Sequence, residues 1–269
     1  MHSLTIDRQR CCGDGLCVKS CFRECFALDE QGRAFWKEDS PSRCVGCGHC
    51  VSVCPRGAIR LDGVGAEDLP EGGMRWSAEE SEAFLRSRRA VRLYAARPLD
   101  RERLARAVHT ASYAPTGTNR REVGFIVMDD PAALNRLREL LAEWMRRYPR
   151  WERHVARYEQ GDDALLRGAP DVIVVHGPER HGDSAEHPSW LAPQTAAAAA
   201  SYLELAMHGM GMGTCWSGLI VRGAGEVAAV RELFRLPPGR SIYAAFLAGY
   251  PVQRFYRIPF REVPSLVWI

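Results

Sequence analysis

Apolar positions along the chain follow two different patterns, and the change between them divides the chain near residue 78. Up to residue 62, apolar residues occur in short runs between cysteines, with little helical periodicity. The runs at 6–7 and 58–61 are expected to form short strands that flank loops. Residues 63–73 are rich in glycine, proline and acidic residues. They predict a linker, which we place at 63–78.

Longer apolar patterns follow from residue 79 to residue 269 and predict a larger domain. Ser77, with Glu80 three residues later, forms a capping-box pattern that is typical of a helix start. Apolar periodicity predicts further helices at 100–111, 131–148, 193–209 and 224–234. Continuous apolar runs predict buried strands at 124–128, 171–176 and 242–247. This mixture favours an α+β fold in which helices cover a sheet in three layers.

Composition and charge narrow the classes of protein. The net charge of +3 over 269 residues is too small to indicate a nucleic acid or an anionic membrane as partner. The longest apolar stretch, 195–207, contains Glu204 and is too short to span a membrane. The N-terminus lacks a secretion signal pattern, so ten cysteines favour metal ligation over disulfides. We therefore expect a cytoplasmic protein.

Nine of the ten cysteines lie within the first 54 residues, and four of them have a diagnostic spacing. The run Cys44-x-x-Cys47-x-x-Cys50-x-x-x-Cys54-Pro55 has the spacing with which bacterial ferredoxins hold [4Fe–4S] clusters. Cys44-x-x-Cys47 alone would also suit half of a zinc site. Zinc ribbons, however, do not need the third and fourth cysteines at these offsets. The run therefore indicates single-electron transfer.

A second cysteine group, at Cys11, Cys17 and Cys21, predicts a second cluster, with Asp14 where the register requires a cysteine. The fourth cysteine of each run serves the neighbouring cluster. One cluster would thus be held by Cys44, Cys47, Cys50 and Cys21, and the other by Cys11, Cys17, Cys54 and Asp14. A carboxylate is a harder ligand than a thiolate. This leaves open an Asp-ligated [4Fe–4S] cluster, a [3Fe–4S] cluster, or substitution by Cys12. Cys25 is expected to be a buried apolar residue.

The segment Arg88-Arg89-Ala90-Val91-Arg92 resembles the Arg-x-Ser-x-Arg/Lys flavin motif of the FMN-dependent nitroreductase family. Ala90 departs from the usual serine, so one hydroxyl contact is lost. Arginine forks suit a phosphate dianion, and Arg88 and Arg92 are four residues apart, so that both can reach one anion. The resemblance implies that Arg88, Arg89, Ala90 and Arg92 contact FMN.

Three further segments are similar to the same family. The turn at 114–119 resembles its Ala-Pro-Ser/Thr-x-x-Asn turn, which implies that the Asn119 amide binds the pyrimidine edge of the flavin. The glycine-rich segment 209–218 implies that Ser217, Gly218 and Leu219 lie near N5 of the flavin, with Cys215 as a packing residue. The tail resembles the family's late basic segment, in which either Arg257 or Arg261 would bind the phosphate.

These resemblances imply a small ferredoxin-like domain at 1–62 followed by a three-layer nitroreductase-like FMN domain at 79–269. They further imply a homodimer with FMN at the interface, where the helix at 195–207 would lie. A low-potential donor would reduce two iron–sulfur clusters, which would pass electrons singly to FMN. FMN would then reduce a small organic acceptor, such as a nitroaromatic or a quinone, by two electrons. The chemistry would be centred on the flavin, with residues 144–168 capping the pocket.

Two other functions remain open. The chain could be a redox-sensing or electron-transfer module that serves a protein partner. The aspartate at position 14, where the register requires a cysteine ligand, favours this function. It could also be a dehydrogenase that passes substrate electrons out through the clusters. The physiological donor and acceptor do not follow from the sequence.

Overall fold

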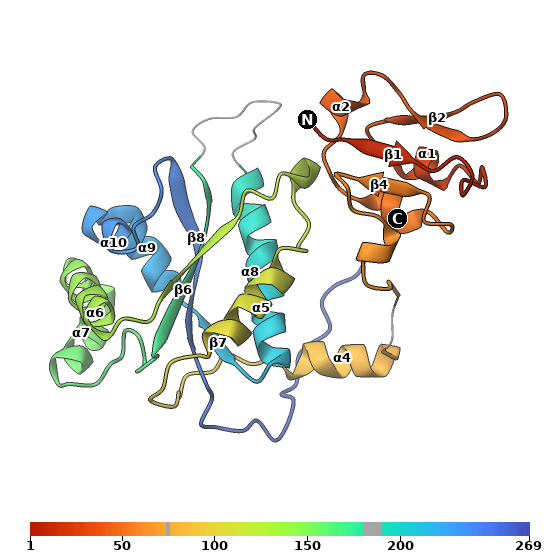
Figure 1. Ribbon diagram of the computed structural model, residues 1–269. Helices are drawn as coiled ribbons and strands as arrows, with labels where there is room; N and C mark the ends of the chain where they lie inside the picture. The colour runs from red at the N-terminus through yellow and green to blue at the C-terminus, as the bar shows by residue number, and fades with distance from the viewer. Residues whose placement is uncertain (74–75, 180–189) are drawn as a thin grey trace. The chain divides into compact units, whose positions relative to one another are not determined.

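The computed structural model describes residues 1–73, 76–179 and 190–269, and residues 74 and 75 of the expected linker lie outside it. The described chain forms two compact units. The first comprises residues 1–77 with 118–120, and the second comprises 78–117 with 121–269. Figure 1 shows the helices and strands of each.

The first unit contains two small antiparallel sheets and three short helices. Strand β1 (Leu4–Ile6) pairs with β4 (Ile59–Leu61), which confirms the strands expected at the two ends of the cysteine-rich region. Strand β2 (Phe26–Leu28) pairs with β3 (Ala34–Trp36). The helices are α1 (Leu16–Ser20), α2 (Ser40–Arg43) and α3 (His49–Val53), followed by the 3₁₀ turn η1 (Ala66–Asp68).

The β2–β3 hairpin, with strands of three residues each, was not predicted. A turn closed by Asp29 specifies it. The Asp29 carboxylate accepts hydrogen bonds from the backbone N–H groups of Gln31 and Arg33, at 3.1 and 2.8 Å. Gly32 has a φ of +72°, which a glycine adopts without strain. The core beside this hairpin is small, and cysteines make up a large part of it.

The second unit is built on a four-stranded antiparallel sheet with the order β5-β6-β8-β7. The strands are β5 (Gly124–Met128), β6 (Asp171–Pro178), β7 (Gly213–Trp216) and β8 (Arg240–Gly249). Side chains alternate between the two faces of the buried strand β6. Val172 and Val174 belong to one hydrophobic core, and Ile173 and Val175 belong to the other.

Helices cover both faces of this sheet, as Figure 1 shows. One core includes residues of α5 (Arg101–Ala111) and α8 (Leu191–Gly209). The other includes residues of α6 (Pro131–Met145), α7 (Glu152–Glu159), α9 (Gly218–Glu226) and α10 (Ala228–Leu233). Helix α4 (Ala78–Ser87) precedes α5, and the turns η2 (Gly117–Asn119) and η3 (Pro149–Trp151) complete the elements. The predicted α+β fold with three layers is thus observed.

The helix expected at 224–234 was wrong in its extent. Two helices, α9 and α10, occupy this region and are separated at Val227. Val227 has extended backbone angles of −127° and 108°, and its N–H donates to the Gly223 carbonyl at 2.8 Å. A helix cannot continue through such a residue. Of the described helices, none is long and apolar enough to cross a membrane.

Candidate functional site

The two cysteine loops of the first unit have the same local form. Gly15 and Gly48 have left-handed φ values of 69° and 76°, and each immediately precedes a short helix, α1 or α3. Asp14 precedes Gly15, just as Cys47 precedes Gly48. Asp14 therefore occupies in the first loop the position that a cysteine occupies in the second.

The remaining cysteines of the two loops also correspond. Cys17 and Cys50 are buried within α1 and α3, and Cys21 and Cys54 are the residues that follow the last turn of each helix. Helices α1 and α3 pack against each other. The cysteine after each helix can therefore serve the neighbouring loop.

Each predicted ligand set surrounds a cavity of its own. A cavity of about 410 Å³ is lined by Cys21, Cys44, Cys47 and Cys50, together with Cys25 and apolar side chains. A second cavity of about 340 Å³ is lined by Cys11, Asp14, Cys17 and Cys54, together with Cys12. Among the described residues, no three His, Cys, Asp or Glu side chains converge closely enough for a single metal ion. Four thiolates that line one cavity match the number and type of ligands that a [4Fe–4S] cluster takes.

Backbone N–H groups point at three of these sulfur atoms. Cys25 N donates to Cys21 Sγ at 3.4 Å, Gly46 N to Cys44 Sγ at 3.4 Å, and Ala58 N to Cys54 Sγ at 3.2 Å. Hydrogen bonds to ligand sulfurs stabilise negative charge on them and tune the reduction potential of a cluster. The cysteine sulfurs, and the N–H groups that donate to them, thus fit iron–sulfur clusters in both cavities.

The surroundings of Asp14 are compatible with all three alternatives that the sequence left open. Asp14 Oδ1 accepts a hydrogen bond from Leu16 N at 2.9 Å, and Cys12 Sγ lies 3.4 Å from Asp14 Oδ2. Both side chains line the second cavity. Cys25, for which only packing was expected, is buried and lines the first cavity.

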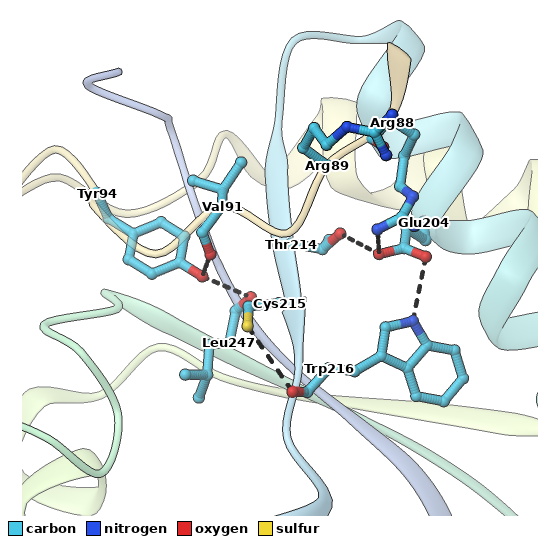
Figure 2. A network of polar contacts seen from close by, with 9 residues as sticks. All are labelled: Arg88, Arg89, Val91, Tyr94, Glu204, Thr214, Cys215, Trp216 and Leu247. Carbon is cyan, nitrogen blue, oxygen red and sulfur yellow. Dashed lines mark hydrogen bonds and ion pairs between the residues drawn. The ribbon is translucent and has the colours of Figure 1, made fainter. Parts of the chain in front are cut away.

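In the second unit, the turn at 88–92 is fixed to the sheet (Figure 2). Val91 N donates to the Thr214 carbonyl of β7 at 2.8 Å. The Tyr94 hydroxyl lies 2.6 Å from the Val91 carbonyl and 3.2 Å from the Leu247 carbonyl of β8. Ala90 packs against the core on this side. The backbone of the arginine motif is therefore held rigidly.

Beside this turn, Figure 2 shows a buried carboxylate that sequence reasoning missed as a site residue. Glu204 of α8 is 7% exposed and accepts hydrogen bonds from Thr214 Oγ1 at 3.0 Å and Trp216 Nε1 at 3.1 Å. Arg88 Nη1 forms an ion pair with it at 3.2 Å. The sequence did contain a signal for this site, because Glu204 is an acidic residue within an otherwise alanine-rich, apolar helix.

Two other arginines, Arg88 and Arg261, interact electrostatically with Arg89. Burial, together with the positive charges of Arg261 and Arg88, lowers the pKa of Arg89. Arg89 Nε is buried and has no hydrogen-bond partner among the described residues. Arg257, by contrast, donates to the Tyr256 carbonyl at 2.8 Å. The group formed by Arg88, Arg89 and Arg261, which we call the arginine cluster, fits a phosphate dianion.

A cavity of about 630 Å³ lies against the start of α9. Four residues that the sequence predicted for flavin contact line it: Arg92, Ser217, Gly218 and Leu219. The Ser217 side chain caps α9 by accepting from Ile220 N at 3.5 Å. The first N–H groups of α9 lack partners within the helix, and its positive end faces this wall.

The other wall of this cavity comes from residues 144–168, the segment that was expected to cap the flavin pocket. Trp151, His154 and Arg167 of that segment line the cavity, as does Trp216 of β7. Trp151 Nε1 and His154 Nδ1 are buried and have no hydrogen-bond partner among the described residues. Two orphaned polar atoms and two indole rings fit a flat ring system with polar edges. None of these four residues was singled out from the sequence as a flavin contact.

Asn119, which was also predicted to contact the flavin, belongs to residues 118–120, which group with the first unit. Its Nδ2 donates to the Val45 carbonyl at 2.8 Å. Its contact with a flavin therefore stays a prediction.

Comparisons with known proteins give a family for each part of the chain. Residues 85–250 match the model of the nitroreductase family, and residues 38–60 match that of the 4Fe-4S binding domain. A protein of Archaeoglobus fulgidus, provisionally named an NADH dehydrogenase/NAD(P)H nitroreductase, is 25% identical over 191 residues. The match covers 70% of this chain and 97% of that protein.

Two solved structures share the fold of the second unit. The nitroreductase with bound FMN from Bacteroides fragilis is 19% identical, with a TM-score of 0.58 over 71% of this chain and 98% of that one. The nitroreductase with bound FMN from Desulfitobacterium hafniense is 17% identical, with a TM-score of 0.56 over 69% of this chain and 96% of that one. With more than half of its length matched, the chain belongs to the nitroreductase family of oxidoreductases and carries a 4Fe-4S binding motif before the family domain.

Proposed function

We propose that this chain is an iron–sulfur flavoprotein that relays single electrons through two clusters to FMN and so reduces a small organic acceptor. When bound, the clusters supply electrons one at a time, and FMN supplies two-electron chemistry. The observation that carries the proposal is that each cysteine set, assigned from spacing alone, surrounds its own cavity. The FMN-bound nitroreductases of the same fold support the flavin half.

In the first unit, one iron–sulfur cluster would be held by Cys21, Cys44, Cys47 and Cys50. Cys11, Cys17 and Cys54, with Asp14 or Cys12, would hold the other. We keep the boundaries 1–62, 63–78 and 79–269 as our proposal for the ferredoxin-like domain, the linker and the flavin domain.

In the second unit, the arginine cluster would bind the phosphate of FMN through charge-assisted hydrogen bonds. Glu204 would orient Arg88 and Trp216, because it contacts both. The N–H groups at the start of α9 would donate to the polar edge of the flavin ring, and the positive end of that helix would stabilise negative charge on it. Trp151 and Trp216 would exclude water from the ring. Asn119 is kept as a further candidate for the pyrimidine edge.

We further propose a cytoplasmic homodimer with FMN at the interface and a low-potential electron donor. Large apolar side chains are exposed along the C-terminal tail, among them Phe255, Tyr256, Phe260 and Trp268. The outward face of α8 carries the small residues Ala197 and Ser201, over which a second chain could pack closely. Burial of such surfaces against a second copy would stabilise the assembly.

An acceptor screen tests the function. Full-length protein, purified anaerobically and reduced with dithionite, is mixed with nitroaromatics and quinones, and product is measured. Rapid reoxidation with product formation is the expected result. Slow reoxidation by every small molecule would favour the redox-sensing module instead, and reduction of the clusters by a substrate would favour the dehydrogenase.

A further inference from the structure

The cavity beside α9 holds an unusual set of charges, and it is here that the proposed acceptor would meet the flavin. Among the residues that the structure describes, Arg92 and Arg167 are the only arginines or lysines that line it, and none of the described aspartates or glutamates does. Among the described residues, neither guanidinium forms an ion pair. Two unpaired cations in a partly enclosed site attract an anion.

The backbone around Arg167 is fixed by a neighbouring carboxylate. Arg167 has a left-handed φ of +57°, and its N–H donates to the Asp163 carbonyl at 2.8 Å. The Asp163 carboxylate accepts from Leu166 N at 2.8 Å and from Gly168 N at 2.9 Å, and it pairs with Arg138 at 2.8 Å. Asp163 is therefore fully engaged and holds the loop without neutralising Arg167.

The remaining surfaces of the cavity suit a flat molecule. Trp151 and His154 form an edge-to-face pair with ring centroids 5.4 Å apart, and each has a buried ring nitrogen without a partner among the described residues. Trp216 lines the same cavity. Aromatic walls favour planar ligands, and a few polar groups among them fix orientation.

We propose that this cavity selects a planar organic acceptor that carries a carboxylate or a similar anion, and that Arg167 binds that anion. The inference rests on the proposed function, because it takes the same cavity as the site of the flavin ring. The flavin phosphate has a separate candidate site in the arginine cluster, none of whose members lines the cavity. Arg167 is thus left for the acceptor.

The test compares two probes that differ in charge and little in shape, 4-nitrobenzoate and its neutral analogue 4-nitrobenzamide. Binding of each to the oxidised full-length holoprotein is followed by tryptophan fluorescence and flavin absorbance. Wild-type protein should bind the carboxylate about 10-fold to 100-fold more tightly, as expected for a charge-assisted hydrogen bond. Equal affinity for the two probes would overturn the proposal.

Variants then assign the anion contact. Arg167→Met should remove most of the preference for 4-nitrobenzoate while 4-nitrobenzamide binds as before, and Arg167→Lys should fall between the two. Arg153→Met, an exposed position on α7 that does not line the cavity, serves as the matched control and should change neither affinity. If Arg167→Met lowered the affinity for both probes equally, or left the preference for 4-nitrobenzoate unchanged, the role of Arg167 would be overturned.

Flavin content separates this proposal from the function on which it rests. If Arg167→Met loses FMN while wild type retains it, Arg167 holds the cofactor and the proposal is wrong. If wild type itself binds no FMN, the proposed function fails, and the charge preference can still be read from tryptophan fluorescence.

Discussion

Glu204 is a single residue on which two candidate flavin contacts depend. Its buried carboxylate accepts from the hydroxyl of Thr214 and the indole of Trp216, and it pairs with Arg88. A buried donor that loses its acceptor keeps the desolvation cost without the compensating bond. Removal of this carboxylate would therefore leave three donors unsatisfied, two on β7 and one on the arginine turn.

Glu204→Ala should lower the free energy of unfolding of the second unit by about 2 to 4 kcal/mol. Glu204→Gln should cost less, because its amide oxygen still accepts hydrogen bonds. Thermal and urea unfolding measure both effects. Glu159→Ala is the control, because its pair with Arg146 is exposed and should contribute less than about 1 kcal/mol. A loss no larger for Glu204→Ala than for the control would contradict this role.

Asp171 predicts a pH dependence at the residue scale. It is buried at the start of β6, where its carboxylate accepts from Leu99 N at 2.9 Å, and burial raises its pKa to about 6. The folded state therefore binds this proton more tightly than the unfolded state, whose pKa is about 3.9. The stability that the proton contributes is complete below pH 4 and is lost as the pH rises through 6.

Asp171→Asn keeps an acceptor for Leu99 and removes the titration. Relative to wild type, the variant should gain about 1 kcal/mol of stability between pH 5 and pH 7.5. Melting curves of both proteins across that range measure the difference. Stability differences that stay constant with pH would show that Asp171 does not titrate in this window.

At the scale of elements, β7 holds the arginine turn in place. A Cβ on Gly213 would lie 2.7 Å from Val91 Cγ2. The backbone N–H of Val91 also donates a hydrogen bond to the carbonyl of Thr214, the next residue of β7. Val91 is buried and β-branched, so it can yield only by moving the turn. Glycine at this position allows the turn and the strand to approach closely.

Gly213→Ala should therefore destabilise the second unit by about 1 to 3 kcal/mol and weaken FMN binding. Gly225→Ala is the matched control, because nothing lies within 4 Å of the added Cβ and its backbone is helical within α9. That change should stabilise α9 by up to about 1 kcal/mol. Equal unfolding temperatures and flavin affinities for the two variants would argue against this packing account.

The elements also show what the sequence could specify. Long apolar patterns located β5, β6 and β8 and the helices α5, α6 and α8. Strand β7 was missed, because its four residues follow a glycine-rich run and become a strand only by pairing with β8. The break at Val227 was missed because the apolar pattern continues across it. Short elements are specified by tertiary partners, which periodicity cannot report.

For the whole molecule, spacing alone predicted the cysteine sets, because the cysteines of each run are close together in sequence and the fourth cysteine of each run serves the neighbouring cluster. Residues 144–168 were expected to cap the flavin-side cavity, but the individual side chains of that segment that line it were not singled out. Trp151, His154 and Arg167 are far from the start of α9 in sequence, and only the fold brings them to it. Glu204 was missed for the same reason, because its partners come from other segments.

The Asp14 corner gives a prediction for the intact protein. Asp14→Cys should supply a fourth thiolate and favour an intact [4Fe–4S] cluster in the second cavity, because thiolate is the softer ligand for iron. Iron analysis and electron paramagnetic resonance measure the change. Cluster signals that are unaltered in both Asp14→Cys and Asp14→Ala would remove Asp14 from the ligands.

We expect one polypeptide to carry both the clusters and the flavin that they feed. The most direct measurement counts iron and FMN in anaerobically purified full-length protein and then follows both centres after a low-potential donor is added. We expect one FMN and about seven to eight iron atoms per chain. The signals of the reduced clusters should appear before the flavin is bleached, and both centres should be reoxidised when an acceptor is added. A colourless protein, or a flavin that reduces at the same rate after Cys44→Ala and Cys47→Ala abolish one cluster, would contradict this expectation.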